Sequence, residues 1–160
     1  MTDRINPIRD TDDEARALAR RLMTEASIAA LGVLDPETGS PYVSRIAVSV
    51  DGTGRLLTLV SDLSRHAAAL RLNPDASILV GEPGPKGDAL GHPRLTLQVR
   101  ARFIPPAPGL RDRWLASHPK AKLYVDFADF RFVTFHILQG YLNGGFGKAF
   151  AMKADDLKLA

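Results

Sequence analysis

Three short apolar runs, separated by tight turns, constrain the fold of this chain more than any other feature of its sequence. Turn-forming clusters that begin at Asp35 and at Asp51 separate the runs, which extend over Ser27–Leu34, Tyr42–Val50 and Arg55–Val60. Parallel strands would need long crossover connections, whereas these turns are only a few residues long. The pattern therefore predicts an antiparallel β-meander.

Later segments predict three more strands, over Ala76–Gly81, Leu95–Ile104 and Phe132–Leu142. In the second of these, apolar residues alternate with polar ones, which is typical of a strand with one buried face. About six strands with only short helices between them favour an antiparallel barrel over a parallel α/β sheet. We therefore expect a mainly β fold of the α+β class, with short flanking helices.

The spacing of apolar residues predicts a first helix from Thr11 to Ser27, with acidic residues in its first turn that suit the helix dipole. Shorter helices are expected over Ser64–Leu72, Leu110–His118 and Ala121–Phe127. The Gly- and Pro-rich stretch from Glu82 to Pro93 is predicted to be a loop. The expected organisation is a single domain over residues 1–160, with a barrel over residues 27–147 and a short tail after it.

The composition supports one self-sufficient domain. The chain has 160 residues, of which 45% are hydrophobic, and a typical domain has roughly 150 residues. It contains no cysteine, which excludes disulfides, thiolate metal sites and cysteine nucleophiles. No metal site is expected, because paired metal-ligand spacing is missing from the four histidines, His66, His92, His118 and His136.

Charge and hydropathy bear on the partners and the location of the protein. The 21 basic and 18 acidic residues leave a net charge of +3. The basic residues are dispersed rather than gathered on one helix, which argues against nucleic acid as a partner. No apolar stretch is long enough to span a membrane, and Met1-Thr2-Asp3-Arg4 lacks the apolar core of a signal peptide. We expect a cytoplasmic protein without a membrane partner.

The segment from Val60 to His66 carries the strongest functional signal. A strand ends at Ser61, Ser64 then stands where a helix N-cap is expected, and Arg65 and His66 follow in the first turn. A helix N-terminus presents free backbone N–H groups to an anion, and two cations there oppose the helix dipole unless an anion lies between them. The alternative is a capped surface helix with two solvated cations.

Arg45 indicates the same kind of ligand. It lies inside a predicted strand, on the face that carries the small or β-branched side chains of Val43, Ala47 and Ser49. An arginine in such a setting can bind an anion, and a cross-strand ion pair is the alternative. Gln98 adds a neutral amide on another predicted strand. These residues are compatible with a phosphorylated ligand.

Together these motifs give the chain a family resemblance. The order of Arg45, the segment Ser61–His66 with Asn73-Pro74 after it, and Leu97-Gln98-Val99-Arg100 resembles the flavin-binding split barrels related to pyridoxamine 5'-phosphate oxidase. The closing segment Gly140–Ala149 is similar to the branch of that superfamily that contains the heme-utilisation proteins. The resemblance implies a six-stranded antiparallel split β-barrel with Greek-key features, and a homodimer with two FMN sites at the subunit interface.

The resemblance also implies a set of cofactor-binding residues. Arg45 is expected at the FMN phosphate, with a cradle completed by Ser61, Ser64 and Arg65. His66 stands where the oxidase commonly has lysine. The edge of the flavin ring is expected beside Ile46, Ala47, Val48 and Ser49. Further contacts to the cofactor are expected from Val60, Gln98, Gly145, Phe146 and Gly147.

Two functions of different classes remain open. The resemblance implies an FMN-dependent oxidoreductase that moves electrons between a reductant such as NAD(P)H and an unidentified small molecule. The alternative is a non-enzymatic protein that binds flavin or heme for heme utilisation, storage, transfer or sensing. Pyridoxamine 5'-phosphate oxidase activity itself is not expected, because the Arg-Leu-His motif that grips the substrate phosphate is missing. No residue is assigned a catalytic role, and heme is the lesser possibility because no histidine follows His136.

Overall fold

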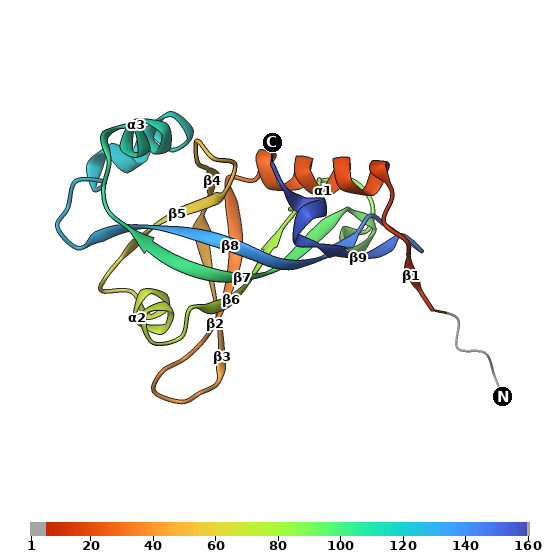
Figure 1. Ribbon diagram of the computed structural model, residues 1–160, viewed down its shortest axis with the longest axis horizontal. Helices are drawn as coiled ribbons and strands as arrows, with labels where there is room; N and C mark the ends of the chain where they lie inside the picture. Colours follow the sequence, from red (N-terminus) through yellow and green to blue (C-terminus); the bar gives the residue numbers. More distant parts are fainter. Residues whose placement is uncertain (1–5, 160) are drawn as a thin grey trace.

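Two long strands run through the middle of the fold. β7 (Arg94–Ile104) and β8 (Phe130–Asn143) pair antiparallel, with one register shift between Gln98 and Val99 (Figure 1). Buried and exposed residues alternate along β7, as the sequence pattern predicts. The arrangement comes from a computed structural model, which describes residues 6–159.

Six strands close into a barrel that includes these two. From β7 the sheet continues through β6 (Asp75–Val80) to β2 (Ile28–Leu34) and β3 (Pro41–Ala47). After Val48 the chain enters β4 (Ser49–Val50), which pairs with β5 (Leu56–Ser61), and β5 pairs back with β8. If β3 and β4 are counted as one strand interrupted at Val48, the predicted six-stranded antiparallel barrel is confirmed.

The chain after residue 147 differs from the short tail that the sequence predicts. β9 (Ala149–Lys153) pairs antiparallel with β8, β1 (Ile8–Arg9) joins β9 in parallel, and the 3₁₀ turn η3 (Ala154–Leu157) follows. Met152 and Leu157 are buried there. A five-residue strand gives too little alternation to be noticed in the sequence, and its partners are close only in the folded chain.

The helices lie around the barrel. α1 (Asp13–Glu25) is capped by Asp12, whose carboxylate accepts the N–H of Ala15 at 2.7 Å. α2 (Arg65–Leu72) lies beside the hairpin of β2 and β3, and α3 (Pro108–Ser117) lies at the opposite end of β7 from α1 (Figure 1). The helix expected over Ala121–Phe127 is a 3₁₀ turn, η2 (Pro119–Leu123), followed by turns. The loop over residues 82–93 is confirmed, with one 3₁₀ turn, η1 (Ala89–Gly91), inside it.

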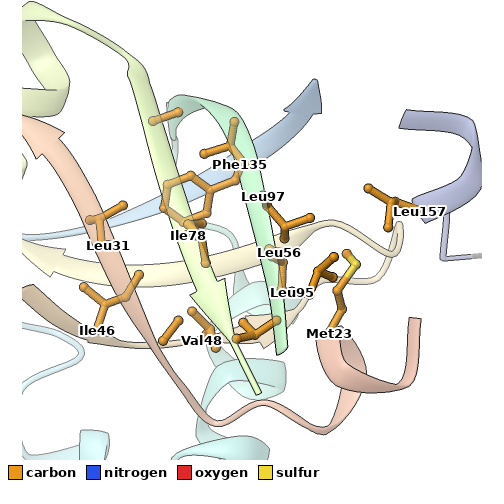
Figure 2. Close-up of a cluster of buried hydrophobic side chains, with 14 of the residues drawn as sticks. Met23, Leu31, Ile46, Val48, Leu56, Ile78, Leu95, Leu97, Phe135 and Leu157 are labelled. Carbon is orange, nitrogen blue, oxygen red and sulfur yellow. The ribbon is translucent and has the colours of Figure 1, made fainter. Parts of the chain in front are cut away.

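Two cores stabilise this arrangement. In the larger one, side chains from several elements meet inside the barrel, among them Leu31 of β2, Ile78 of β6 and Leu97 of β7 (Figure 2). Full burial of a side chain of this size contributes about 1.5–3 kcal/mol. The smaller core lies under α3 and η2 and includes Trp114, whose ring is 4.3 Å from that of His118. Trp114 is only 1% exposed, so its side chain packs within this core.

One further property of the elements concerns membranes. Within residues 6–159, none of the helices combines the length and the apolar character that a membrane crossing requires. The segment Met1–Arg4, on which the expectation of no signal peptide rests, lies outside the described residues.

Candidate functional site

The start of α2 is the first part of the candidate site, and its serines are already engaged. Ser64 caps the helix, since its Oγ accepts the N–H of Ala67 at 3.2 Å, and its own O–H is donated to the carbonyl of Ser61 at 2.6 Å. The Ser61 hydroxyl donates to Asp129 at 2.6 Å. The predicted N-cap is confirmed. Both hydroxyl hydrogens are used within the chain, so neither is offered to an anion.

Arg65 is also paired within the chain. Its Nη1 lies 2.9 Å from Oδ2 of Asp35 and 3.6 Å from Oε2 of Glu37, at the end of the β2–β3 hairpin. The guanidinium also lies over the ring of Tyr42, 5.9 Å from its centroid. The negative charge of Asp35 raises the pKa of Arg65 above its ordinary value, with a smaller contribution from Glu37. The group of Arg65, Asp35 and Glu37 therefore carries a net charge of about −1 at neutral pH.

His66 faces inward from the first turn of α2. Its Nδ1 lies 3.1 Å from the Oγ of Ser44 on β3. Burial lowers the pKa of His66 below its ordinary value of 6.5, so the imidazole is neutral at pH 7. His66 therefore supplies no positive charge at the start of α2, where the sequence predicts one.

Arg45 lies on the opposite face of β3 from Ser44. Alternation along the strand turns Arg45 and Val43 outward, and Arg45 is exposed. It forms no hydrogen bond or ion pair with any residue in the range 6–159. Among the predicted phosphate ligands, Arg45 is therefore the cation that remains available.

A partly apolar sheet surface surrounds Arg45. We call it the outer face, and we define it by ten outward residues of β3, β2, β6, β7 and β8, which are Val43, Arg45, Ala30, Gly32, Leu34, Ser77, Leu79, Thr96, Gln98 and Leu138. Val43 is 67% exposed, and Leu79 and Leu138 are 42% and 44% exposed. These are large apolar side chains left open to solvent, next to residues as small as Gly32.

Two shallow hollows lie on the outer face. One, of about 380 Å³, is lined by Arg45, Leu79 and the start of the loop at Glu82. The other, of about 500 Å³, is lined by Leu34, Gln98 and other residues of the same strands. The register places Arg45 opposite Ala30, Ala30 opposite Leu79, and Leu79 opposite Thr96. Strand spacing then separates Arg45 from Gln98 by about 15 Å along the sheet, so one copy of the chain does not bring them together.

The predicted contacts to the flavin edge are mostly buried. Ile46 and Val48 are at most 5% exposed, so their side chains belong to the core. Val60, predicted as a further contact to the cofactor, is buried as well. The backbone oxygens nearby are used as well, because the carbonyl of Ala47 accepts from Thr58 at 2.6 Å and that of Val48 lies 2.8 Å from Nε2 of His118.

Ser49, the last residue predicted at the flavin edge, is buried too. Its hydroxyl lies 3.0 Å from that of Ser117 on α3. The segment 46–49 is therefore tied to β5 and α3 rather than open to a ligand.

The glycine-rich turn between β8 and β9 stands apart from the other predicted residues. Gly145 and Gly147 have positive φ angles of 121° and 70°, which the turn requires and other residues rarely adopt. Phe146 between them is 83% exposed, and its ring lies near Gly91 in the loop over residues 82–93. The hollow beside Arg45 is bordered by the start of that loop, at Glu82 and Pro83, and none of the residues lining it belongs to the turn.

These observations test whether the predicted residues fit a flavin phosphate. At the start of α2 they do not fit, since Ser61 and Ser64 donate their hydroxyl hydrogens within the chain and two carboxylates face Nη1 of Arg65. On the outer face Arg45 is free to bind an anionic group. The acidic partners of Arg65 could not be predicted from the sequence, because Asp35 and Glu37 occupy a turn cluster typical of any hairpin. Within residues 6–159, no group of three histidine or acidic side chains is arranged to hold a metal ion.

Comparisons with known proteins agree with the fold. The family described as CREG, beta-barrel, matches residues 10–157. A solved chain with 47% sequence identity superposes with a TM-score of 0.90 and covers 95% of this chain and 100% of that chain. None of the curated proteins matches this chain.

Two further solved structures bear on the predicted resemblance. A heme-binding protein from Mycobacterium smegmatis has 26% identity and a TM-score of 0.80, and the match covers 92% of this chain but only 61% of that one. A Clostridium acetobutylicum protein of the pyridoxinephosphate oxidase family has 16% identity and a TM-score of 0.68, over 92% of this chain and 99% of that one. The latter likeness shows the fold alone. With its barrel topology and its match over residues 10–157, the chain belongs to the CREG β-barrel family.

Proposed function

We propose that two copies of this chain pair through their outer faces and bind a planar cofactor between them. The cofactor class is a flavin, with FMN first, and heme is the alternative. The observation that carries the proposal is Arg45, an unpaired cation among the described residues, set in a hollow on an exposed apolar sheet surface. An arginine there can bind the phosphate of a flavin or a carboxylate of a porphyrin.

The outer face has the composition of a subunit interface. Val43, Leu79 and Leu138 expose apolar area that pairing would bury, and Gly32 and Ala30 between them allow a close approach. A twofold axis makes each face meet its own copy, so a residue far from Arg45 in one copy can lie near Arg45 of the other. Pairing is therefore a route by which Gln98 of the second copy can reach the cofactor held by Arg45.

Each cofactor class has its own support. The Mycobacterium smegmatis relative is a heme-binding protein, whereas a flavin is implied by the resemblance carried by Arg45 and the segment Ser61–His66. A bound flavin would itself supply redox chemistry, so the role left to this chain is to bind and orient it. With FMN bound, we propose electron transfer between a reductant such as NAD(P)H and a small molecule.

The test is spectroscopic and hydrodynamic. The purified protein is titrated separately with FMN, riboflavin and hemin while visible absorbance is recorded, and its mass is measured by sedimentation velocity. The proposal expects a dimer and a saturable spectral change with at least one of these ligands. A monomer that leaves all three spectra unchanged at micromolar concentrations contradicts it. A spectral change with hemin alone would assign heme, and not a flavin, as the cofactor.

A further inference from the structure

We propose that Asp35 and Glu37 close the N-terminus of α2 to phosphate, so that preference for a phosphate-bearing cofactor depends on Arg45. The carboxylate of Asp35 lies 2.9 Å from Nη1 of Arg65, where a ligand's phosphate would lie to bind that atom, and Glu37 lies 3.6 Å from the same atom. Asp35 is therefore a specificity-determining residue. For flavins the inference rests on the proposed function, whereas for inorganic phosphate it stands alone.

Asp35 is held in place independently of Arg65. Its Oδ1 accepts the N–H of Glu37 at 3.0 Å, and its backbone bonds with Ser40 at 2.9 Å and with Gly39 at 2.7 Å. The residue is only 8% exposed. A carboxylate fixed by its own turn does not need to reorganise to pair with a cation, so it competes strongly with a ligand anion in solution.

The charges around Arg65 oppose a second anion. Arg65 faces both Asp35 and Glu37, and Asp129 accepts the hydroxyl of Ser61 at the end of β5. The nearby Asp62 is shared between Arg71 at 2.8 Å and Arg131 at 3.3 Å.

At the start of α2, the four carboxylates of Asp35, Glu37, Asp62 and Asp129 outnumber the three guanidiniums of Arg65, Arg71 and Arg131, so this set of groups carries a net negative charge. His66 is held neutral because burial lowers its pKa. A phosphate dianion would meet like charge with no side-chain hydroxyl free to receive it.

The first test uses inorganic phosphate and the amide resonances of Arg65 and His66 in a ¹⁵N-labelled protein, at constant ionic strength. In the unmodified protein, these resonances are expected not to shift saturably at millimolar phosphate. In the isosteric double variant Asp35→Asn, Glu37→Gln, they are expected to shift, with an apparent Kd at least roughly tenfold lower. The control is Asp75→Asn, which removes the acid of the exposed pair with Arg100 and is expected to behave like the unmodified protein.

Two results overturn the inference. One is a saturable shift of both amides in the unmodified protein, and the other is a well-dispersed spectrum of the double variant with no gain in phosphate binding. Should the double variant fail to fold, Glu37→Gln alone is measured, since Glu37 is largely exposed and its change leaves Asp35 in place. A smaller gain than roughly tenfold but above that of Asp75→Asn is expected from it, and no gain contradicts the inference.

A second test separates this inference from the proposed function. The Kd values for FMN and riboflavin are measured for the unmodified protein and for the double variant. The double variant is expected to favour FMN over riboflavin by roughly tenfold more than the unmodified protein does, and an unchanged ratio contradicts the inference. If neither flavin binds, the flavin form of the proposed function fails, and the phosphate measurement still decides the role of Asp35.

Discussion

The Nδ1 atom of His66 lies 3.1 Å from the Oγ of Ser44, and this contact joins α2 to β3 one residue before Arg45. It turns Ser44 toward the helix, and alternation then turns Arg45 to the outer face. The start of α2 and Arg45 therefore lie on opposite faces of β3, although the sequence predicts both in one phosphate-binding cradle. Its physical consequence is a dependence of stability on pH.

Acidification is expected to destabilise the protein through His66. Burial lowers the pKa of His66 in the folded state, so the unfolded chain binds a proton first as the pH falls through 6.5. The neutral imidazole makes its full contribution to stability above pH 6.5. This contribution decreases as the pH drops below 6.5, and it stops decreasing once the pH is below the pKa of His66 in the folded protein. Urea unfolding at about pH 7.5, 6 and 5 measures this slope. The variant His66→Gln is expected to flatten it, while His136→Gln, at an exposed position, leaves it unchanged. Equal slopes in all three proteins would contradict this assignment.

Gly140 is required where β8 packs against the C-terminal turn. A Cβ at this position would lie 2.6 Å from Leu157 and 3.4 Å from Leu97, so Gly140→Ala overpacks the barrel. We expect a loss of about 1–3 kcal/mol in the free energy of unfolding. The matched control is Gly109→Ala in α3, where the added Cβ meets nothing within 4 Å and the expected change is a gain of about 0.4–1 kcal/mol. If Gly140→Ala unfolds at the same denaturant concentration as the unmodified protein, the packing of η3 on β8 is incorrect.

Asp35 is expected to contribute to stability as well as to selectivity. Asp35→Ala removes the buried acceptor of the Glu37 N–H and the partner of Arg65, so we expect a loss of about 1–3 kcal/mol by denaturant unfolding. Asp75→Ala breaks an exposed pair and is expected to cost at most about 1 kcal/mol. Equal losses in the two variants would show that the hairpin does not depend on Asp35.

Self-association is expected to depend on the outer face. Leu79→Glu places an unpaired charge in the proposed interface, and burial of such a charge is unfavourable. We expect the dimer dissociation constant to rise by roughly tenfold or more in sedimentation velocity. Leu123→Glu, on the 80% exposed Leu123 of η2, serves as the control and is expected to leave the constant unchanged. The interface is misplaced if Leu123→Glu weakens the dimer and Leu79→Glu does not.

The fold could be predicted from the sequence to a large extent because its elements carry strong local patterns. The alternation on β7 and the turns after Leu34 and Val50 define the meander and the barrel. The strand β9 could not be predicted, since its five residues are stabilised by pairing with β8. Likewise, the bend at Val48 depends on β4 pairing with β5 and β3 pairing with β2.

The candidate site could be predicted only in part. The N-cap at Ser64 follows from local chemistry, and the outward position of Arg45 follows from alternation. The pairing of Arg65 with Asp35 joins residues 30 positions apart, so no local pattern shows that the cation is already neutralised. Sequence motifs specify which residue types stand near a helix start, whereas the fold decides which partners they meet.

The most direct test of the central claim is a fluorescence titration of FMN with the unmodified protein, Arg45→Ala and Arg102→Ala. Arg45 is assigned to the anionic group of the cofactor, so Arg45→Ala is expected to raise the Kd by roughly tenfold to a hundredfold, as the loss of a charge-assisted hydrogen bond does. The control Arg102→Ala, at an exposed arginine further along β7, is expected to leave the Kd for FMN unchanged. An Arg45→Ala protein that binds FMN as tightly as the unmodified protein would contradict the account.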